Sequence, residues 1–339
     1  MRSLCSPPST YCRTRSLAAT FESIIRLTEK LPIDFAKNKE MFDFDHIEAW
    51  GPRLCRELSV AVPGDVSQAI ASGKPKFVED ARDILLSKVD QTVVLRLVVN
   101  WLKLQTIVGY HGSRLTAEEI VDVRRDGLRV LKATDREQRL RTILSAHPRW
   151  PTVERSLTEV VDAYGVNWLQ NNSGCREGSV HATISRSGLI KSFKHYLKFG
   201  SEFDQVVSQR LLENEGVELL GGYGSPVIFK ITVPGVVAFH AANPCLPELP
   251  IGLPNLVREL LDAWAFWLAN PTFSTQTLAV DCGLKFSTDV PAEWIIDCEQ
   301  VADLRVLESE NPGCASVKRK AEEERIQRKA STLADEVIE

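Results

Sequence analysis

The stretch TIVGYHGSRLT, residues 106–116, decides the fold. It opens on β-branched and apolar residues, which predict a strand over 106–112. That strand ends on His111, Gly112 and Ser113. These residues are unfavourable in a strand whose only role is packing, because glycine weakens strands and serine favours turns. The tripeptide therefore indicates that the end of this strand serves a purpose other than packing.

A helix with clear start and stop signals follows the tripeptide. Thr116 and Glu119 form the capping-box pattern that opens a helix, and Ile120 follows as an apolar position. Gly127 is the residue type that ends one. The sequence predicts a unit of strand, His-Gly-Ser, helix and glycine.

The remaining chain divides into a helical first part and a mixed second part. Residues 17–105 show mainly helical periodicity, and the apolar run 87–105 predicts a buried helix. Beyond it we expect helices over 152–164 and 190–212 and around 256–267, strands over 179–185 and 227–233, a loop at 221–224, and paired strands within 277–296. The predicted class is α+β.

Four regions follow from this pattern. Residues 1–20 form an extension with three arginines, four serines and no acid, either disordered or targeting-like. Residues 21–104 are a helical N-terminal region, and 105–308 are the domain that carries the motifs. Residues 309–339 are charged on most faces and predict a helical or disordered tail.

Composition excludes several classes of protein. The chain has 339 residues, 44% hydrophobic and 25% charged, with a net charge of −4, so it is an ordinary globular chain without an overall basic footprint for nucleic acid. No apolar run reaches the roughly 20 residues that span a bilayer. Eight scattered cysteines form no CxxC pair and six histidines add no ligand spacing, so we expect no metal. The expected location is cytoplasmic, with the nucleus or a target cell as alternatives.

Three motifs in order carry a resemblance. They are HGSRLTAEEIVDVRRDGLRVL from His111, GCREGSVHATISRSG over 174–188, and VPAEWIIDCEQV over 290–301. Together they resemble the catalytic domain of ADP-ribosyltransferases of the PARP and diphtheria-toxin type. The first and third motifs fit closely, whereas the middle one is the loosest. The resemblance implies a split β-sandwich of two facing antiparallel sheets with NAD in the cleft between them.

The resemblance also implies roles for individual residues. Glu293 would be the carboxylate that stabilises the oxocarbenium-like state when the nicotinamide–ribose bond of NAD breaks. His111 would hold the adenosine-side ribose through its ring N–H, and the backbone of Gly112 would pair with the nicotinamide carboxamide. Either Ser185 or Ser187 would supply a hydroxyl, and either His181 or Tyr196 a stacking ring. The full set expected at NAD is His111, Gly112, Ser113, Arg114, His181, Ser185, Ser187 and Tyr196, with His111 and Glu293 as the catalytic pair.

Departures from the family pattern shape the expected reaction. Val180 occupies the position of the family's middle tyrosine, so a single transfer of ADP-ribose to a protein or nucleic-acid acceptor is favoured over polymer synthesis. Pro291-Ala292-Glu293 lacks the first acid of the arginine-modifying members, so arginine is not the favoured acceptor. The alternatives are NAD hydrolysis, an RNA 2′-phosphotransferase, for which Arg114, Arg176 and Arg186 are few, and a catalytically silent fold that binds a partner. A toxin, defence or regulatory role stays open.

Overall fold

The strand β2 (Thr106–Leu115) is the element around which the sheet is arranged. A computed structural model describes residues 41–164, 178–242, 254–280 and 282–301; the predicted extension 1–20 and tail 309–339 lie outside them. Within these residues the strands form an open six-stranded sheet in the order β5-β3-β2-β4-β6, with β1 against β2. The α+β class is therefore confirmed, but the strands form one sheet rather than two facing sheets. The other strands are β1 (Met41–Phe42), β3 (Val180–Thr183), β4 (Ser225–Pro234), β5 (Gly283–Phe286) and β6 (Ile295–Gln300).

The two edges of β2 are paired very differently. One edge pairs with β4 along its whole length, from Thr106 opposite Pro234 to Leu115 opposite Ser225. The other edge runs parallel to β1 at its start and meets β3 through one pair, Tyr110 and Thr183. Within the described part of the chain, no strand pairs with this edge beyond Tyr110. The sheet is thus split between β2 and β3 from His111 onward.

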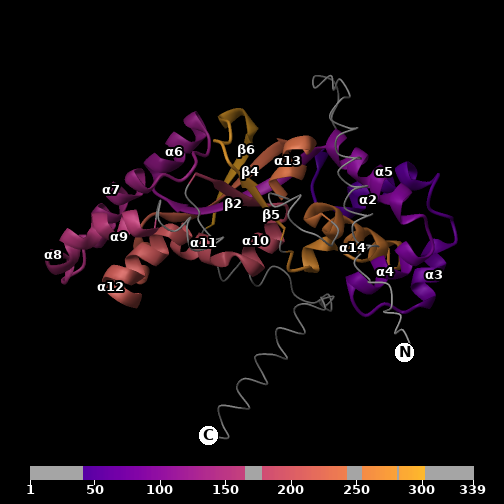
Figure 1. Cartoon of the computed structure of the whole chain (residues 1–339), viewed down its shortest axis with the longest axis horizontal. Coiled ribbons are helices and arrows are strands. Elements are labelled where there is room, and N and C mark those ends of the chain that lie inside the picture. The colour runs from indigo at the N-terminus through magenta and orange to yellow at the C-terminus, as the bar shows by residue number, and fades with distance from the viewer. Residues whose placement is uncertain (1–40, 165–177, 243–253, 281, 302–339) are drawn as a thin grey trace, which may run out of the picture.

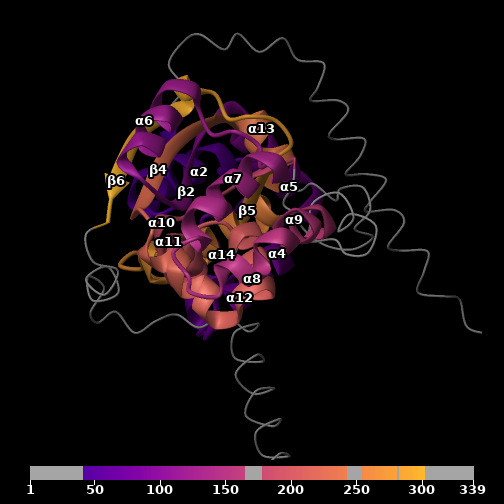
Figure 2. The same cartoon turned by 90° about the vertical axis from the view of Figure 1, so that its left-hand side faces the viewer.

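Helices gather at both ends of the sheet. In Figure 1 the helices α2 to α5 and α14 lie at one end, and α7, α8, α9 and α12 lie at the other; Figure 2 views the molecule from this second end. At the first end are α2 (Ile47–Leu58), α3 (Val66–Ser72), α4 (Val78–Ser87), α5 (Gln91–Leu104), α13 (Gly235–Ala242) and α14 (Asn255–Ala269). The others are α6 (Ala117–Asp126), α7 (Ala133–Leu144), α8 (Trp150–Val153), α9 (Leu157–Tyr164), α10 (Arg186–Ser192), α11 (Lys194–Phe199) and α12 (Glu202–Gly222). None of the described helices is long and apolar enough to cross a membrane.

One continuous apolar core joins the N-terminal helices to the sheet. It includes Phe42, Trp50 and Trp264, whose side chains are almost wholly buried, together with Ile107 and Phe229 from the central strands. The predicted helix over 87–105 is present as α5, which Asp90 caps by accepting the Val93 N–H at 3.2 Å. A second cluster, contributed by α7, α9 and α12, is separate from this core. The N-terminal helices therefore pack against β2 through a shared apolar core.

Two acids fasten the N-terminal segment to the split. Asp43 accepts hydrogen bonds from the Tyr110 hydroxyl at 2.8 Å and from Lys230 Nζ at 3.0 Å. Asp45 accepts the Ser185 hydroxyl at 2.6 Å and the Ser187 N–H at 3.1 Å, and its burial raises the pKa of its carboxyl. These bonds link the chain after β1 to β2, to β4 and to the start of α10.

Three sequence-based predictions need correction. The strands expected as a pair within 277–296 do not pair with each other, because β5 and β6 occupy opposite edges of the sheet. The expected loop at 221–224 begins late, since α12 continues to Gly222. The helix expected over 190–212 is divided among the end of α10, α11 and the first half of α12, with a turn at Gly200, whose φ is 81°.

The predicted capping box and glycine stop are confirmed, and they shape the segment that crosses the sheet. Thr116 Oγ1 accepts the Glu119 N–H at 3.2 Å, while the Glu119 carboxylate accepts the Thr116 N–H at 2.8 Å. Gly127 ends α6 with φ of 87° and ψ of −176°. Only glycine adopts this backbone region readily. Leu128 then exchanges backbone hydrogen bonds with Val290.

Replacing Gly127 with alanine should destabilise the protein. A Cβ there would lie 2.2 Å from the Val290 carbonyl oxygen, in addition to the unfavourable backbone geometry. We expect Gly127→Ala to lower the free energy of unfolding by about 2 kcal/mol or more in urea titrations. The control is Gly64→Ala, where a Cβ would meet nothing within 4 Å. Equal stability of the two variants would contradict this account of Gly127.

Candidate functional site

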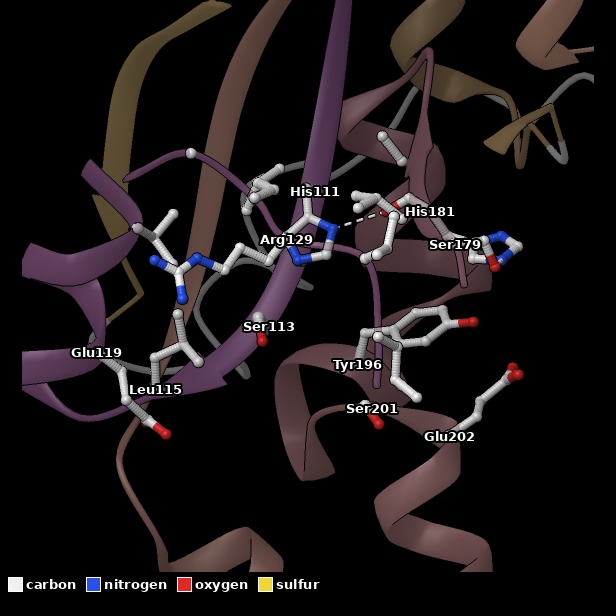
Figure 3. Close-up of a pocket in the computed structure, with 18 of the residues that line it drawn as sticks. His111, Ser113, Leu115, Glu119, Arg129, Ser179, His181, Tyr196, Ser201 and Glu202 are labelled. Atoms are coloured by element: carbon white, nitrogen blue, oxygen red, sulfur yellow. Dashed lines mark hydrogen bonds between the residues drawn. The ribbon is translucent and has the colours of Figure 1, made fainter. Parts of the chain in front are cut away.

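A cavity of about 570 Å³ lies where β2 and β3 separate. This volume is within the range of about 300–1,000 Å³ that is usual for small-molecule sites. The motif residues His111, Gly112 and Ser113 line it from β2, and the segment Gly127–Lys132 lines it after α6. Figure 3 shows Tyr196 and Glu202 on the helices that face β2. Further lining residues include Tyr110, Leu115, Ser179, His181, Leu189, Phe193 and Ser201.

A side chain, not the backbone, bridges the two strands at the split. If the register of Tyr110 and Thr183 continued for two residues, Gly112 would lie opposite His181. Instead, the carbonyl oxygen of His181 lies 2.6 Å from Nδ1 of His111. A carbonyl oxygen can only accept, so Nδ1 carries the proton and donates it. The side-chain hydrogen bond of His111 thus takes the place of a backbone hydrogen bond between β2 and β3.

This bond fixes what the rest of the His111 ring can do. With the proton on Nδ1, the neutral ring presents Nε2 as an acceptor. Burial lowers the pKa of His111, which favours the neutral form. In Figure 3 the second ring nitrogen lies on the side away from His181. The resemblance implied that a ring N–H would hold a ribose; the structure corrects this, because that N–H is used by His181 and the available nitrogen accepts.

The split also leaves a strand edge beside the cavity. From His111 onward, β2 has no strand partner on the β3 side among the described residues. The opposite face of Gly112 is crowded, since a Cβ there would lie 2.8 Å from Leu189 Cδ1. A larger residue would push against the helices α10 and α11. Gly112 thus lets these helices approach β2 while its backbone borders the cavity.

An aromatic ring and a carboxylate face this strand from one short segment. Tyr196 lies on α11, and Glu202 is the first residue of α12, whose N-cap is Ser201. Nε2 of His195 lies 3.2 Å from the Glu202 carboxylate, and the rings of His195 and Tyr196 have centroids 4.2 Å apart. Gly200, with φ of 81°, makes the turn between the two helices. Tyr196 and Glu202 are held together by contacts to the same histidine.

Another wall of the cavity is formed by the charged segment 127–132, between α6 and α7. Leu131 donates to the Ser179 carbonyl at 3.3 Å and accepts from the Gly178 N–H at 2.8 Å, which ties this segment to the start of β3. Arg129 pairs with Asp126 at 2.6 Å. Lys132, the N-cap of α7, is an exposed cation on the cavity wall.

The structure does not bring Glu293 together with His111. Glu293 lies in the short 3₁₀ turn η4 (Ala292–Trp294), before β6 rather than within a strand. Its side chain is exposed, and it is not among the residues that line the cavity. The reason lies in the topology, because β6 is two strands away from β2 on the fully paired side of the sheet.

Three further predicted residues also lie outside the cavity lining. Ser185 caps α10 and donates to Asp45, and Ser187 is buried beside it. Arg114 donates from Nε to the Tyr223 carbonyl at 3.0 Å. Its position on β2 alternates with those of His111 and Ser113, so its side chain leaves the opposite face of the strand. Of the two candidate rings, both His181 and Tyr196 line the cavity.

Glu202 lines the cavity, although none of the three motifs contains it. A serine followed by an acid is the ordinary pattern of a helix start, and Ser201 does accept the Asp204 N–H at 3.2 Å. The available signal was proximity in sequence: Tyr196, already a candidate, lies six residues before Glu202, and Gly200 between them permits a turn.

Comparisons of the chain with protein-family models, with curated proteins and with solved structures found no match. Within residues 41–164, 178–242, 254–280 and 282–301, no group of three or more His, Cys, Asp or Glu side chains is placed to hold a metal ion.

The half-buried imidazole of His111 predicts a pH dependence of stability. The pKa of His111 is lowered from its ordinary 6.5 on folding, so below pH 6.5 the unfolded chain binds more protons there than the folded chain. The stabilising contribution is therefore complete above pH 6.5 and is lost as the pH falls toward the folded pKa. The loss is at most about 1.4 kcal/mol for each pH unit.

We expect the free energy of unfolding of the wild type to fall more between pH 7.5 and 5.5 than that of His111→Asn. Asparagine keeps an amide N–H that can donate to His181 but does not titrate. Urea titrations at the two pH values measure both proteins. Parallel curves for the two would show that His111 titrates alike in the folded and unfolded chains.

Proposed function

We propose that this protein consumes NAD in the cavity at the split, cleaving the nicotinamide–ribose bond and transferring a single ADP-ribose unit to each acceptor site. The proposal depends chiefly on one observation: His111, Tyr196 and Glu202 line the same cavity of about 570 Å³. The motif resemblance supplies the reaction, and the geometry supplies residues suited to it. The cavity lies at the split between β2 and β3 of one sheet, rather than between the two facing sheets that the resemblance implies.

The edge of β2 suits a planar amide. A carboxamide carries both N–H donors and a carbonyl acceptor, which are the groups that pair with a strand edge. The backbone of Gly112 borders the cavity where β2 has no strand partner among the described residues. The ring of Tyr196 lines the same space and offers a surface on which nicotinamide can stack.

Glu202 is the carboxylate best suited to stabilise positive charge on the ribose. Of the other cavity acids, Glu119 is engaged in its capping box and with Arg139. Asp122 and Asp126 both pair with Arg125, and Asp135 lies in the first turn of α7. Among these acids only Glu202 follows the segment that carries Tyr196. Glu202 has a contact to His195 that orients one carboxylate oxygen. As bond cleavage places positive charge on the sugar, a fixed carboxylate lowers the barrier. This role replaces the one expected for Glu293.

The acceptor character of His111 bears on the alternative substrates. Nε2 accepts a hydrogen bond from a hydroxyl, but phosphate oxygens at neutral pH are acceptors themselves. A phosphorylated ribose at this position would place two acceptors against each other. This favours NAD, whose adenosine ribose has free hydroxyls, over NADP at this position. NAD hydrolysis, in which water is the acceptor, uses the same residues. It differs from transfer to a macromolecule only in whether ADP-ribose is released or attached.

Removing the negative charge of Glu202 should slow nicotinamide release. We expect Glu202→Gln to lower the rate from NAD about 100-fold or more, the usual effect of losing one charge-stabilising group. Glu218→Gln, an exposed change on the same helix, is the matched control and should retain the wild-type rate. Nicotinamide is quantified by chromatography, with labelled NAD to follow ADP-ribose.

Two results would contradict this assignment. If Glu293→Gln abolished release and Glu202→Gln did not, the motif-based carboxylate would be right and the cavity-based one wrong. If the wild type released no nicotinamide, with or without cell lysate as a source of acceptors, the proposed function itself would fail.

His111 should also discriminate between NAD and NADP, which differ by a phosphate on the adenosine ribose. We expect Glu202→Gln, in which turnover is suppressed, to bind NADP at least about tenfold more weakly than NAD in calorimetric titrations, equivalent to about 1.4 kcal/mol. Adding His111→Lys, which supplies a cation, should reduce or reverse the difference. Equal affinities before that change would show that His111 does not receive a ribose hydroxyl.

A further inference from the structure

Ser179 and His181 form a hydroxyl–imidazole pair, which has no role in the reaction proposed above. Ser179 Oγ lies 3.1 Å from His181 Nε2. Both residues line the cavity together with Tyr196 and Glu202. Figure 3 shows Ser179 and His181 beside each other at the start of β3, on the same side of the view as Tyr196 and Glu202. The Ser179 residue is 5% exposed and is one of the residues that line the cavity.

The backbone around this pair is held on both sides. The Ser179 carbonyl accepts the Leu131 N–H at 3.3 Å, and the Leu131 carbonyl accepts the Gly178 N–H at 2.8 Å. The His181 carbonyl accepts from His111 at 2.6 Å. Val180 between them pairs with Phe286 of β5. A hydroxyl and an imidazole fixed in this way need little reorganisation to react.

The geometry is that of an activated nucleophile. When Nε2 of His181 is unprotonated, the Ser179 hydroxyl donates to it, and the imidazole can take the proton as the oxygen attacks. Serine hydroxyls are weak nucleophiles without such a base. Ser113 and Ser201 also line the cavity, but no contact to an imidazole is seen for their hydroxyls among the described residues.

We propose that Ser179 is itself an acceptor, so that the protein attaches ADP-ribose to its own Ser179; this rests on the proposed function. The bond between the ribose anomeric carbon and the nicotinamide nitrogen breaks, and its electron pair leaves with neutral nicotinamide. The bond between Ser179 Oγ and that carbon forms. The hydroxyl proton passes to His181 Nε2 and from there to solvent. The products are the modified chain, nicotinamide and one proton.

Because donor and acceptor share one cavity, the modification takes place within a single chain. Its rate constant should not depend on protein concentration. A chain carrying the group at Ser179 has its acceptor used up, so modification at this residue ends at one ADP-ribose per chain.

The test is intact-mass and peptide mass spectrometry of the full chain after incubation with NAD. We expect a gain of one ADP-ribosyl group, located on Ser179 by electron-transfer fragmentation, at a rate unchanged by tenfold dilution. Ser179→Ala should abolish labelling at this position. His181→Gln should slow it about 100-fold, the usual contribution of a general base. Ser145→Ala, an exposed serine that donates to the Thr142 carbonyl, is the matched control and should be labelled like the wild type.

A second variant guards against loss of folding. Ser179→Thr keeps a hydroxyl at the same place and should retain labelling there, which a purely structural effect of Ser179→Ala would not explain. Nicotinamide release without label at Ser179 would overturn this inference and leave the proposed function standing. No nicotinamide release from the wild type would overturn both.

Discussion

The hydrogen bond from His111 Nδ1 to the His181 carbonyl is the interaction on which the site depends. At 2.6 Å it joins two strands that have stopped pairing through their backbones. It supplies a hydrogen bond to the His181 carbonyl in place of one from the β2 backbone, and it fixes the separation of β2 and β3. It also fixes the tautomer of His111, so the cavity receives an acceptor nitrogen and a neutral ring. One bond therefore sets the shape and the polarity of this wall.

The surrounding structure maintains that split from both ends. Asp43 and Asp45 hold Tyr110 and the start of α10 in place, so β3 ends early and α10 turns away. Gly127 lets the following segment cross to Val290 and then reach the start of β3 at Ser179. These contacts come from segments far apart in the sequence. The N-terminal helices accordingly contribute to the site through the core that they share with β2.

The local signals in the sequence predicted much of the fold near β2. The β-branched and apolar residues of 106–112, the capping box at Thr116 and the stop at Gly127 depend on neighbouring residues only. The strand, the capping box and the stop are present, although β2 extends beyond residue 112 to Leu115. The order in which the strands pair could not be predicted from such local signals. The segments 283–286 and 295–300 look like a hairpin because they are close in sequence, but they lie on opposite edges of the sheet. Strand order depends on which long-range pairings bury more apolar surface, and no local pattern records that.

By itself, the sequence determined that a strand carries His111, Gly112 and Ser113, although β2 continues to Leu115 rather than ending on them. It also named His181 and Tyr196 as candidate rings, and both line the cavity. Only the tertiary structure decided which carboxylate faces them. Glu293 had the favoured motif and lies exposed before β6, whereas Glu202 had an ordinary helix-start context and lines the cavity. A motif fixes residue types along the chain, but the facing of two side chains is set by the turn at Gly200 and by strand order, which are properties of the folded chain.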